Sequence, residues 1–174
     1  MQRTEISELG EFGLIEHISK TIELKNPSTL KGIGDDAAIL SFENRVLLTT
    51  DLLLEGIHFD LTYFPLKHLG YKAAVVNFSD IYAMNGLPRQ ITVSLGISKR
   101  FSVEDVEDIY DGLNLACKEY GVDIVGGDTS ASLTGLTISI TCVGEAVSDK
   151  IVKRDGAKET DLIFVSGDIG AAFM

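Results

Sequence analysis

The sequence predicts a mixed α/β fold of the α+β kind, in which helices pack on one face of a mixed β-sheet. Three observations favour this fold. Apolar residues alternate between Ile91 and Ile97, as they do in a half-buried strand. They recur at helical spacing between residues 102 and 120. Long gaps that carry helical patterns separate the predicted strands, which is typical of a sheet covered by helices.

The remaining elements are predicted from shorter patterns of the same two kinds. A glycine-rich turn over residues 32–36 precedes a short apolar run, residues 37–40. The pair Asn85-Gly86 and then Pro88 end the second helix. Up to residue 143, the patterns predict helices over residues 11–20, 69–84 and 102–120, and strands over residues 45–50, 91–97, 122–125 and 136–143.

The helix over residues 102–120 has the clearest ends. Ser102 is suited to cap its first turn, with Asp105 three residues further on. Gly121 follows the last apolar position and ends the helix. The apolar stripe between these ends comprises Val106, Ile109, Leu113, Ala116, Cys117 and Tyr120.

The chain is acidic, with 26 acidic against 15 basic residues and a formal net charge of -11 over 174 residues. This charge repels phosphodiester backbones, so no nucleic-acid partner is expected. It is compatible with one nucleotide held through divalent cations, because a cation inverts the local charge. No apolar run approaches the length of a membrane span, so no membrane partner is expected either.

The two cysteines, Cys117 and Cys142, stand alone in apolar stretches and form no metal-binding pattern. Buried free thiols are the simplest interpretation. Such thiols suit a reducing compartment, and a cytoplasmic location is expected. The start of the chain lacks the apolar core of a signal peptide.

The last residues predict an element that is cut short. Residues 162–166 favour a strand, residues 167–170 a turn, and residues 171–174 the first turn of a helix. A natural domain seldom stops at such a point. The expectation is therefore a fragment of a longer protein, with an amino-terminal domain over residues 1–150 and a second, truncated domain that starts over residues 151–174.

Four sites share one local pattern, in which an apolar run borders an aspartate beside Gly, Ser or Thr. They are Gly34-Asp35-Asp36, Thr49-Thr50-Asp51, Asn77-Phe78-Ser79-Asp80 and Gly126-Gly127-Asp128-Thr129. Asp51 and Asp128 are expected at strand ends and Asp80 within a helix. Mg²⁺ commonly takes one or two carboxylates together with waters and phosphate oxygens, and Thr49 and Thr50 can add oxygens. If these residues converge, they form a divalent-metal and phosphate site.

Each of these sites also has a purely structural interpretation, because aspartate is common in turns and at helix N-termini. Asp35 and Asp36 fit a plain turn before a strand, and whether Asp35 binds metal stays open. Asp80 is harder to explain in this way, since a carboxylate among apolar helix neighbours needs a partner. The pair Gly126-Gly127 either lets the backbone approach a phosphate or forms a tight turn.

Other nucleotide and nucleophile motifs are missing. Neither GxxxxGK[ST] nor GxGxxG occurs, so P-loop and Rossmann binding are not indicated, and the protein-kinase motifs are absent. The role of His58 stays open: it can be a general base, a substrate contact or a surface residue. Ser and Cys nucleophiles lack a local motif.

Longer strings around these residues run through nearly the whole chain. They are residues 10–15, 32–38, 49–59, 70–84, 126–129, 154–157 and 165–172. Together, in this order and at these spacings, they resemble the thiamine-monophosphate kinases, within the superfamily of aminoimidazole-ribonucleotide synthetase-like ATP-binding proteins. Each string alone is modest evidence, whereas the ordered set is highly specific.

This resemblance implies an enzyme that transfers the γ-phosphoryl group of ATP to thiamine monophosphate, giving thiamine diphosphate and ADP. It implies that residues 1–150 form an ATP-binding and Mg²⁺-binding domain with that superfamily's amino-terminal fold, and that several Mg²⁺ ions act with ATP as co-substrate. The implied metal positions are Asp36, Thr49, Thr50, Asp51, Asp80 and Asp128. The implied ATP contacts are Tyr110, Gly127, Asp128 and Arg154, and His58 is the implied contact to the thiamine phosphate.

No residue is expected to act as a general acid or base. The acceptor is already an anionic phosphate, and phosphoryl transfer depends mainly on positioning and charge neutralisation. Several Mg²⁺ ions on an aspartate cluster address the repulsion between two polyanions directly.

The resemblance also implies parts that this chain lacks. Family members carry a second α/β domain after the Ser166-Gly167-Asp168 region, so the chain alone is expected to be inactive. They form homodimers through the first domain, and the exposed apolar strand face expected over Ile91–Ile97 would suit that contact. Two alternatives stay open, namely another ATP-using synthetase of the superfamily and a non-catalytic module that binds Mg²⁺ and nucleotide.

Overall fold

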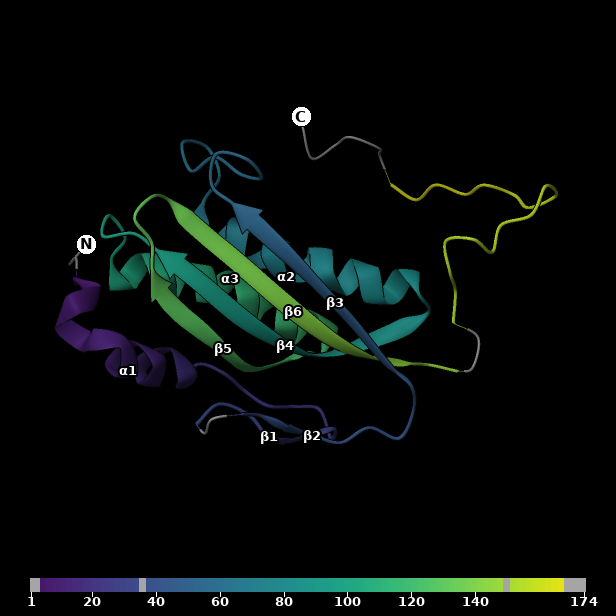
Figure 1. Ribbon diagram of the computed structural model, residues 1–174, viewed down its shortest axis with the longest axis horizontal. Helices are drawn as coiled ribbons and strands as arrows, with labels where there is room; N and C mark the ends of the chain where they lie inside the picture. The colour runs from purple at the N-terminus through teal and green to yellow at the C-terminus, as the bar shows by residue number, and fades with distance from the viewer. Residues whose placement is uncertain (1–3, 35–36, 149–150, 168–174) are drawn as a thin grey trace.

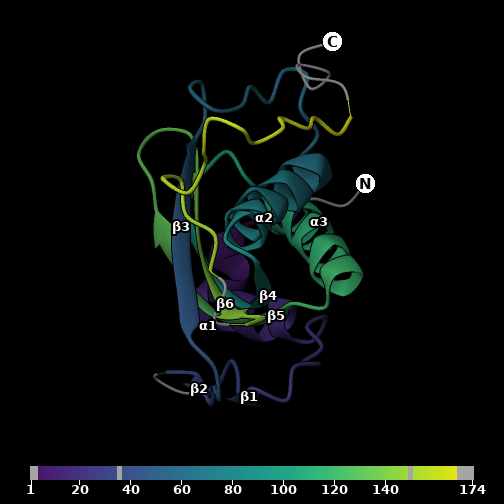
Figure 2. The same ribbon diagram turned by 90° about the vertical axis from the view of Figure 1, so that its right-hand side faces the viewer.

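The computed structural model describes residues 4–34, 37–148 and 151–167. It confirms the predicted mixed α/β fold: a four-stranded sheet stands in front of α2 and α3 in Figure 1. Figure 2 shows that both helices cover the same face and leave the other face open. The elements in chain order are α1 (Ile6–Ser19), β1 (Thr29–Lys31), β2 (Ile39–Leu40), β3 (Val46–Leu54), α2 (Leu66–Ala83), β4 (Gly86–Ile97), α3 (Val103–Tyr120), β5 (Asp123–Ala131) and β6 (Leu136–Ala146).

The main sheet has the strand order β3-β6-β4-β5, so β3 and β5 form its two edges. The pairs β3–β6 and β4–β6 are antiparallel, whereas β4 and β5 run parallel. One row of paired residues crosses the whole sheet from Asp51 through Ile140 and Val93 to Gly127. β1 and β2 pair separately as a small antiparallel ribbon.

The core lies between the sheet and its two helices. Alternate residues of β4 and β6 point into it, among them Val93, Leu95 and Ile140, which are almost completely buried. The apolar stripe Ile91–Ile97 therefore faces α2 and α3, and the expectation that it is an exposed dimer face was wrong. An alternating pattern identifies a half-buried strand, but it does not say whether helices of the same chain cover the apolar side.

Close packing of α2 on α3 depends on one glycine in each helix. A Cβ added at Gly70 would lie 2.0 Å from the carbonyl oxygen of Ile109, and one at Gly112 would lie 1.9 Å from that of Lys67. Only a residue without a side chain fits at either position. This contact fixes the position of α2, the helix that carries Asp80.

The predicted ends of α3 are confirmed. The Ser102 hydroxyl accepts a hydrogen bond from the Asp105 N–H at 3.3 Å, and the Asp105 carboxylate accepts one from the Ser102 N–H at 2.8 Å. Gly121 ends the helix in the left-handed conformation, with a φ of 67°. The helix predicted over residues 11–20 is found in α1, which ends one residue earlier at Ser19 and begins with a turn separated from the rest by the non-helical Gly10.

The edge strands are longer than predicted. β3 continues past Asp51 to Leu54, and β5 continues past Asp128 to Ala131, so neither aspartate lies at a strand end. An edge strand tolerates polar side chains because one side of it meets solvent. Its length is set by the neighbouring strand with which it pairs, and short apolar runs underestimate that length.

The strand predicted over residues 162–166 is absent. Residues 151–167 contain no helix or strand, and Leu162, Ile163, Phe164 and Val165 are exposed. A strand needs a partner for its hydrogen bonds, and the main sheet does not pair with this segment. The helical turn predicted over residues 171–174 lies outside the described residues. Among the helices that the structure describes, none is both long and apolar enough to cross a membrane.

Candidate functional site: an acidic seam and a cavity at opposite sheet edges

Predicted oxygen ligands meet where β3 passes α2. Thr49 and Asp51 point toward the helices because they alternate with Thr50 along β3, in phase with the buried Leu47. The Thr49 hydroxyl donates a hydrogen bond to Oδ2 of Asp80 at 2.7 Å. We call Thr49, Asp51 and Asp80 the β3–α2 seam.

The carboxylates of the β3–α2 seam repel each other. Burial raises the pKa of Asp51 above its ordinary value, the negative charge of Asp80 raises it further, and His58 acts in the opposite direction. Asp51 is therefore within electrostatic reach of both residues. A divalent cation would remove this repulsion, since its charge exceeds that of either carboxylate.

The donor set of the seam fits Mg²⁺. It consists of two carboxylates and a hydroxyl, all oxygen ligands, and Mg²⁺ is usually bound by one or two carboxylates with waters and phosphates completing the sphere. Within the described ranges no group of three or more His, Cys, Asp or Glu is placed to hold a metal ion. Asp36 and Asp35 lie outside the described residues, so the predicted role of Asp36 stays a prediction.

Thr50 lies on the opposite side of β3 from the β3–α2 seam. Its hydroxyl donates to the carbonyl oxygen of Ile140 at 3.0 Å and accepts from the Thr141 hydroxyl at 3.2 Å. Thr141 is its partner across the antiparallel pair, on the open face of the sheet. The structure therefore does not bring the Thr50 hydroxyl together with Asp51 and Asp80.

A cavity of about 480 Å³ lies at the other edge of the sheet, along β5. Three of the four predicted ATP contacts line it, namely Tyr110, Gly127 and Asp128. Apolar residues of α1 and of the segment before β2 complete the lining, among them Phe12, whose exposed fraction is 85%. An apolar pocket with a few polar groups is typical of a small-molecule site.

Tyr110 and Gly127 differ in what they offer the cavity. Burial raises the pKa of Tyr110 to about 12, so its phenol stays neutral at physiological pH and can donate a hydrogen bond. Gly127 lies against β4, and a Cβ there would be 1.9 Å from the carbonyl oxygen of Val93. Gly126 has no such restriction, because its nearest contact would be Thr92 Cγ2 at 3.8 Å.

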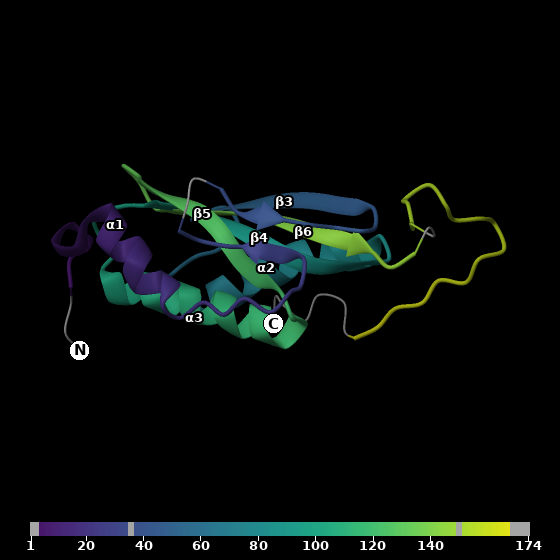
Figure 3. The same cartoon turned by 90° about the horizontal axis from the view of Figure 1, so that it is seen from below.

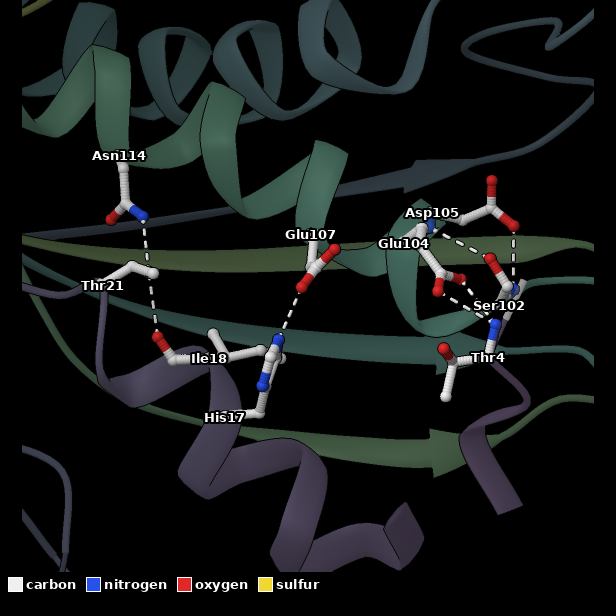
Figure 4. Close-up of polar contacts among 9 residues, drawn as sticks. All are labelled: Thr4, His17, Ile18, Thr21, Ser102, Glu104, Asp105, Glu107 and Asn114. Atoms are coloured by element: carbon white, nitrogen blue, oxygen red, sulfur yellow. Dashed lines mark hydrogen bonds and ion pairs between the residues drawn. The ribbon is translucent and has the colours of Figure 1, made fainter. Parts of the chain in front are cut away.

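Polar contacts attach the α1 wall of the cavity to α3. Figure 4 shows three of them, and Figure 3 shows α1 alongside α3 near the β5 edge. His17 Nε2 lies 2.5 Å from Glu107 Oε1, and Asn114 donates to the Thr21 hydroxyl at 3.0 Å. The Thr4 N–H donates to the Glu104 carboxylate, and this hydrogen bond is the main cause that lowers the pKa of Glu104 to about 2.

The two parts of the candidate site are separate within one chain. Asp51 lies on β3 and Asp128 on β5, with two strands between them. Three strand spacings correspond to roughly 14 Å. The structure therefore brings Asp51 and Asp80 together but leaves Asp128 with the cavity. Arg154 is exposed in the segment after β6 and is not part of the cavity lining.

Sequence reasoning missed Asp123, a fully buried carboxylate at the start of β5. Its oxygens accept hydrogen bonds from the Lys25 N–H at 2.6 Å, the Asn26 N–H at 3.0 Å and the Thr29 hydroxyl at 2.6 Å. These bonds fix the chain that leads into the cavity wall at Ile33. A lone carboxylate inside the apolar run from Val122 to Val125 was the signal for it, since a buried charge needs partners.

The chain matches the family model described as AIR synthase related protein, N-terminal domain, over residues 34–146. It is 43% identical to thiamine-monophosphate kinase of Aquifex aeolicus over 95% of this chain and 51% of that protein. It is 36% identical to thiamine-monophosphate kinase of Bacillus subtilis over 94% of this chain and 51% of that protein. The chain thus spans about half the length of the curated relatives it matches.

Solved structures agree with this likeness. AaThiL complexed with AMPPCP and TMP matches with a TM-score of 0.61 and 42% identity, over 91% of this chain and 48% of that one. The hydrogenase maturation protein HypE matches with a TM-score of 0.67 and 23% identity, over 81% of this chain and 43% of that one. At that identity the likeness to HypE concerns the fold alone.

Proposed function

The chain belongs to the family of AIR synthase related proteins, and from this premise we propose that it is the amino-terminal domain of a thiamine-monophosphate kinase. The reaction transfers the γ-phosphoryl group of ATP to a phosphate oxygen of thiamine monophosphate and releases ADP. The observation that carries the proposal is the 42% identity to AaThiL, which was solved in complex with AMPPCP and TMP. Residues 1–150 would form the nucleotide and metal domain, and residues 151–174 would begin the next one.

We assign the two sheet edges different tasks. The β3–α2 seam would hold Mg²⁺ through Asp51, Asp80 and Thr49. The Thr50 hydroxyl lies on the opposite side of β3 and Asp128 at the other edge, so Asp128 would instead meet cations that accompany the nucleotide in the cavity, and the metal role of Asp36 stays a prediction. Bound Mg²⁺ neutralises phosphate charge, which is the main requirement of this chemistry. The cavity would bind ATP through Tyr110, Gly127 and Asp128, with Arg154 as a further contact.

The neighbours of each group support this assignment. The apolar cavity lining suits a nucleobase, while Gly127 keeps β5, the strand that carries Asp128, close against β4. His58 lies within electrostatic reach of Asp51 and would contact the phosphate of the acceptor. None of these residues is required as a general base, because the attacking oxygen is already anionic.

A homodimer through the open face of the sheet is part of the proposal. Leu48 and Leu52 of β3 are exposed on that face, and apolar side chains gain free energy when a partner covers them. Changing both to Lys is expected to shift the full-length protein from dimer to monomer in sedimentation. The matched control is Leu115→Lys. Leu115 is an exposed leucine of α3, and its substitution is expected to leave the dimer intact.

The compartment that we propose is the cytoplasm. Cys117 and Cys142 are free and buried, as structural thiols are in reducing compartments.

The test supplies the full-length protein with ATP, Mg²⁺ and thiamine monophosphate and measures thiamine diphosphate. Formation of thiamine diphosphate and ADP in equal amounts is the expected result. ATP consumption without thiamine diphosphate would favour another ATP-using synthetase of the superfamily. Mg²⁺-dependent ATP binding without any turnover would favour the non-catalytic module.

A further inference from the structure

His58 is held at the end of β3 by two hydrogen bonds to one residue. Its N–H donates to the carbonyl oxygen of Leu54 at 2.9 Å, and its ring Nδ1 accepts from the Leu54 N–H at 3.0 Å. Because Nδ1 uses its lone pair in this bond, the proton of the neutral ring sits on Nε2. Nε2–H is therefore the ring donor that stays available to a ligand.

Lys72 of α2 holds the same segment from the helix side. Its ammonium donates to the carbonyl oxygen of His58 at 3.3 Å and lies 5.4 Å from the centre of the Phe64 ring. His58 and Phe64 both belong to the segment that connects β3 to α2, so Lys72 contacts this segment at two points. A cation over an aromatic face is attracted to it, so Phe64 orients the Lys72 side chain toward His58.

The rest of the turn is attached independently of Lys72. The Glu55 carboxylate pairs with Arg100 and accepts from the Leu136 N–H at 2.8 Å. Phe59 is buried, and its carbonyl oxygen accepts from the Gly56 N–H at 2.8 Å. Among the described residues, the hydrogen bond to the His58 carbonyl comes from Lys72. Removing the Lys72 ammonium therefore acts on His58 rather than on the whole turn.

We infer that Lys72 is a positioning residue, which holds His58 so that Nε2–H donates to a phosphate oxygen of the acceptor beside the β3–α2 seam. The inference rests on the proposed function for the identity of the acceptor. A donor that is fixed in advance binds an anion better than one that must be ordered on binding. Lys72 acts through His58 and does not itself contact the phosphate.

The test is a double-mutant cycle in the full-length protein, with KM measured separately for thiamine monophosphate and for ATP. Lys72→Met is expected to raise the KM for thiamine monophosphate about tenfold, the size of one hydrogen bond to a charged group. The KM for ATP is expected to stay unchanged. Lys72→Arg is expected to restore the acceptor KM, since a guanidinium can also donate to a carbonyl and stack on Phe64.

The decisive comparison uses His58→Ala as the background. If Lys72 acts through His58, Lys72→Met adds nothing to the effect of His58→Ala on the acceptor KM. Multiplying effects would show that Lys72 binds the phosphate itself and would overturn the inference. Lys67→Met is the matched control, because Lys67 lies on the same helix but pairs with Asp111 of α3 at 3.3 Å.

A second readout separates this inference from the proposed function. Nitrogen NMR of the His58 ring needs no turnover, and the expected spectrum is that of the Nε2–H tautomer in the wild type. Lys72→Met is expected to move the ring toward a mixture of tautomers, whereas Lys67→Met is not. If the wild type makes no thiamine diphosphate, the proposed function fails, while a ring in the Nδ1–H form would overturn the inference by itself.

Discussion

The two edges of the sheet offer a ligand different things. At β3, the seam supplies carboxylates that repel each other, and this charge makes it suited to a cation. At β5, the cavity supplies shape: apolar side chains, a neutral phenol and a glycine in contact with the next strand. The comparison teaches that one edge is defined by charge and the other by close packing. Substitutions that change only charge should therefore affect the first edge and, at the second edge, Asp128, whereas substitutions that change only volume should affect the second edge.

The largest expected effect comes from removing a charge at the β3–α2 seam. Asp80→Asn keeps the volume of the side chain and its contact with Thr49 but lowers the charge available to a divalent cation. In the full-length protein we expect kcat to fall about 100-fold to 1000-fold at saturating ATP, the scale of losing one preorganised electrostatic group. Steady-state assays of thiamine diphosphate formation measure the change.

The control for this prediction is Asp108→Asn. Asp108 is an exposed residue of α3, so this substitution makes the same isosteric change outside the β3–α2 seam. Its kcat is expected to match the wild type. Near-normal turnover of Asp80→Asn would count heavily against a metal site at β3.

The second effect comes from adding volume at β5. Gly127→Ala places a Cβ 1.9 Å from the Val93 carbonyl oxygen, so the pairing of β5 with β4 must shift. Overpacking of this kind costs about 2 kcal/mol of unfolding free energy, and ATP affinity should fall with the displaced cavity lining. Urea unfolding and nucleotide titration measure both changes.

The neighbouring glycine provides a matched control at β5. Gly126→Ala meets only Thr92 Cγ2 at 3.8 Å, an ordinary contact distance. It is expected to unfold at the same urea concentration as the wild type. Equal destabilisation by the two substitutions would mean that packing against β4 does not distinguish them.

Local chemistry explains which parts of this arrangement were predictable. The ends of α3 were predictable, because Ser102, Asp105 and Gly121 act on residues only a few positions away from them. The length of β3 was not predictable, since its last residue, Leu54, pairs with Thr137 of β6, which is far away in the sequence. Apolar runs mark where a strand exists, whereas its ends depend on the partner strand.

The same distinction applies to the candidate site. The aspartates were recognised from their neighbours, but spacing along the chain does not say which of them meet. Thr49 meets Asp80 because α2 packs over β3, and Asp128 is distant because β6 and β4 are inserted between the edges. The apolar run around Asp123 indicates a buried carboxylate that needs partners, but only the structure reveals that these partners lie in the 25–29 segment.

A third prediction separates Asp123 from the ligand-binding carboxylates. Asp123→Asn leaves one oxygen where two now accept from Lys25, Asn26 and Thr29, and it turns an N–H₂ group toward donors. Leaving buried groups unsatisfied costs about 2 kcal/mol, which urea unfolding measures. Asp111→Asn, at an exposed pair with Lys67, is the control and is expected to change stability by less than about 0.5 kcal/mol. Equal losses in both variants would contradict the structural role of Asp123.

The smallest expected effect again concerns the charge at β3, now as stability. Burial first and Asp80 second raise the pKa of Asp51 above its ordinary 3.8. Folding therefore favours the protonated form, and the ionised form of Asp51 costs stability at neutral pH. The cost disappears as the pH falls below the ordinary pKa, where the carboxyl is protonated in both states.

Asp51→Asn is accordingly expected to raise the melting temperature at pH 7 without divalent cations, and by less in acid. Mg²⁺ should reverse the order, because a cation that binds the folded state stabilises the wild type and finds one ligand fewer in the variant. Thermal unfolding of both proteins at two pH values, with and without Mg²⁺, covers the four conditions. A variant that is less stable than the wild type at pH 7 without Mg²⁺ would show that Asp51 is held by attraction rather than repulsion. The β3 edge would then lose the feature that distinguishes it from β5.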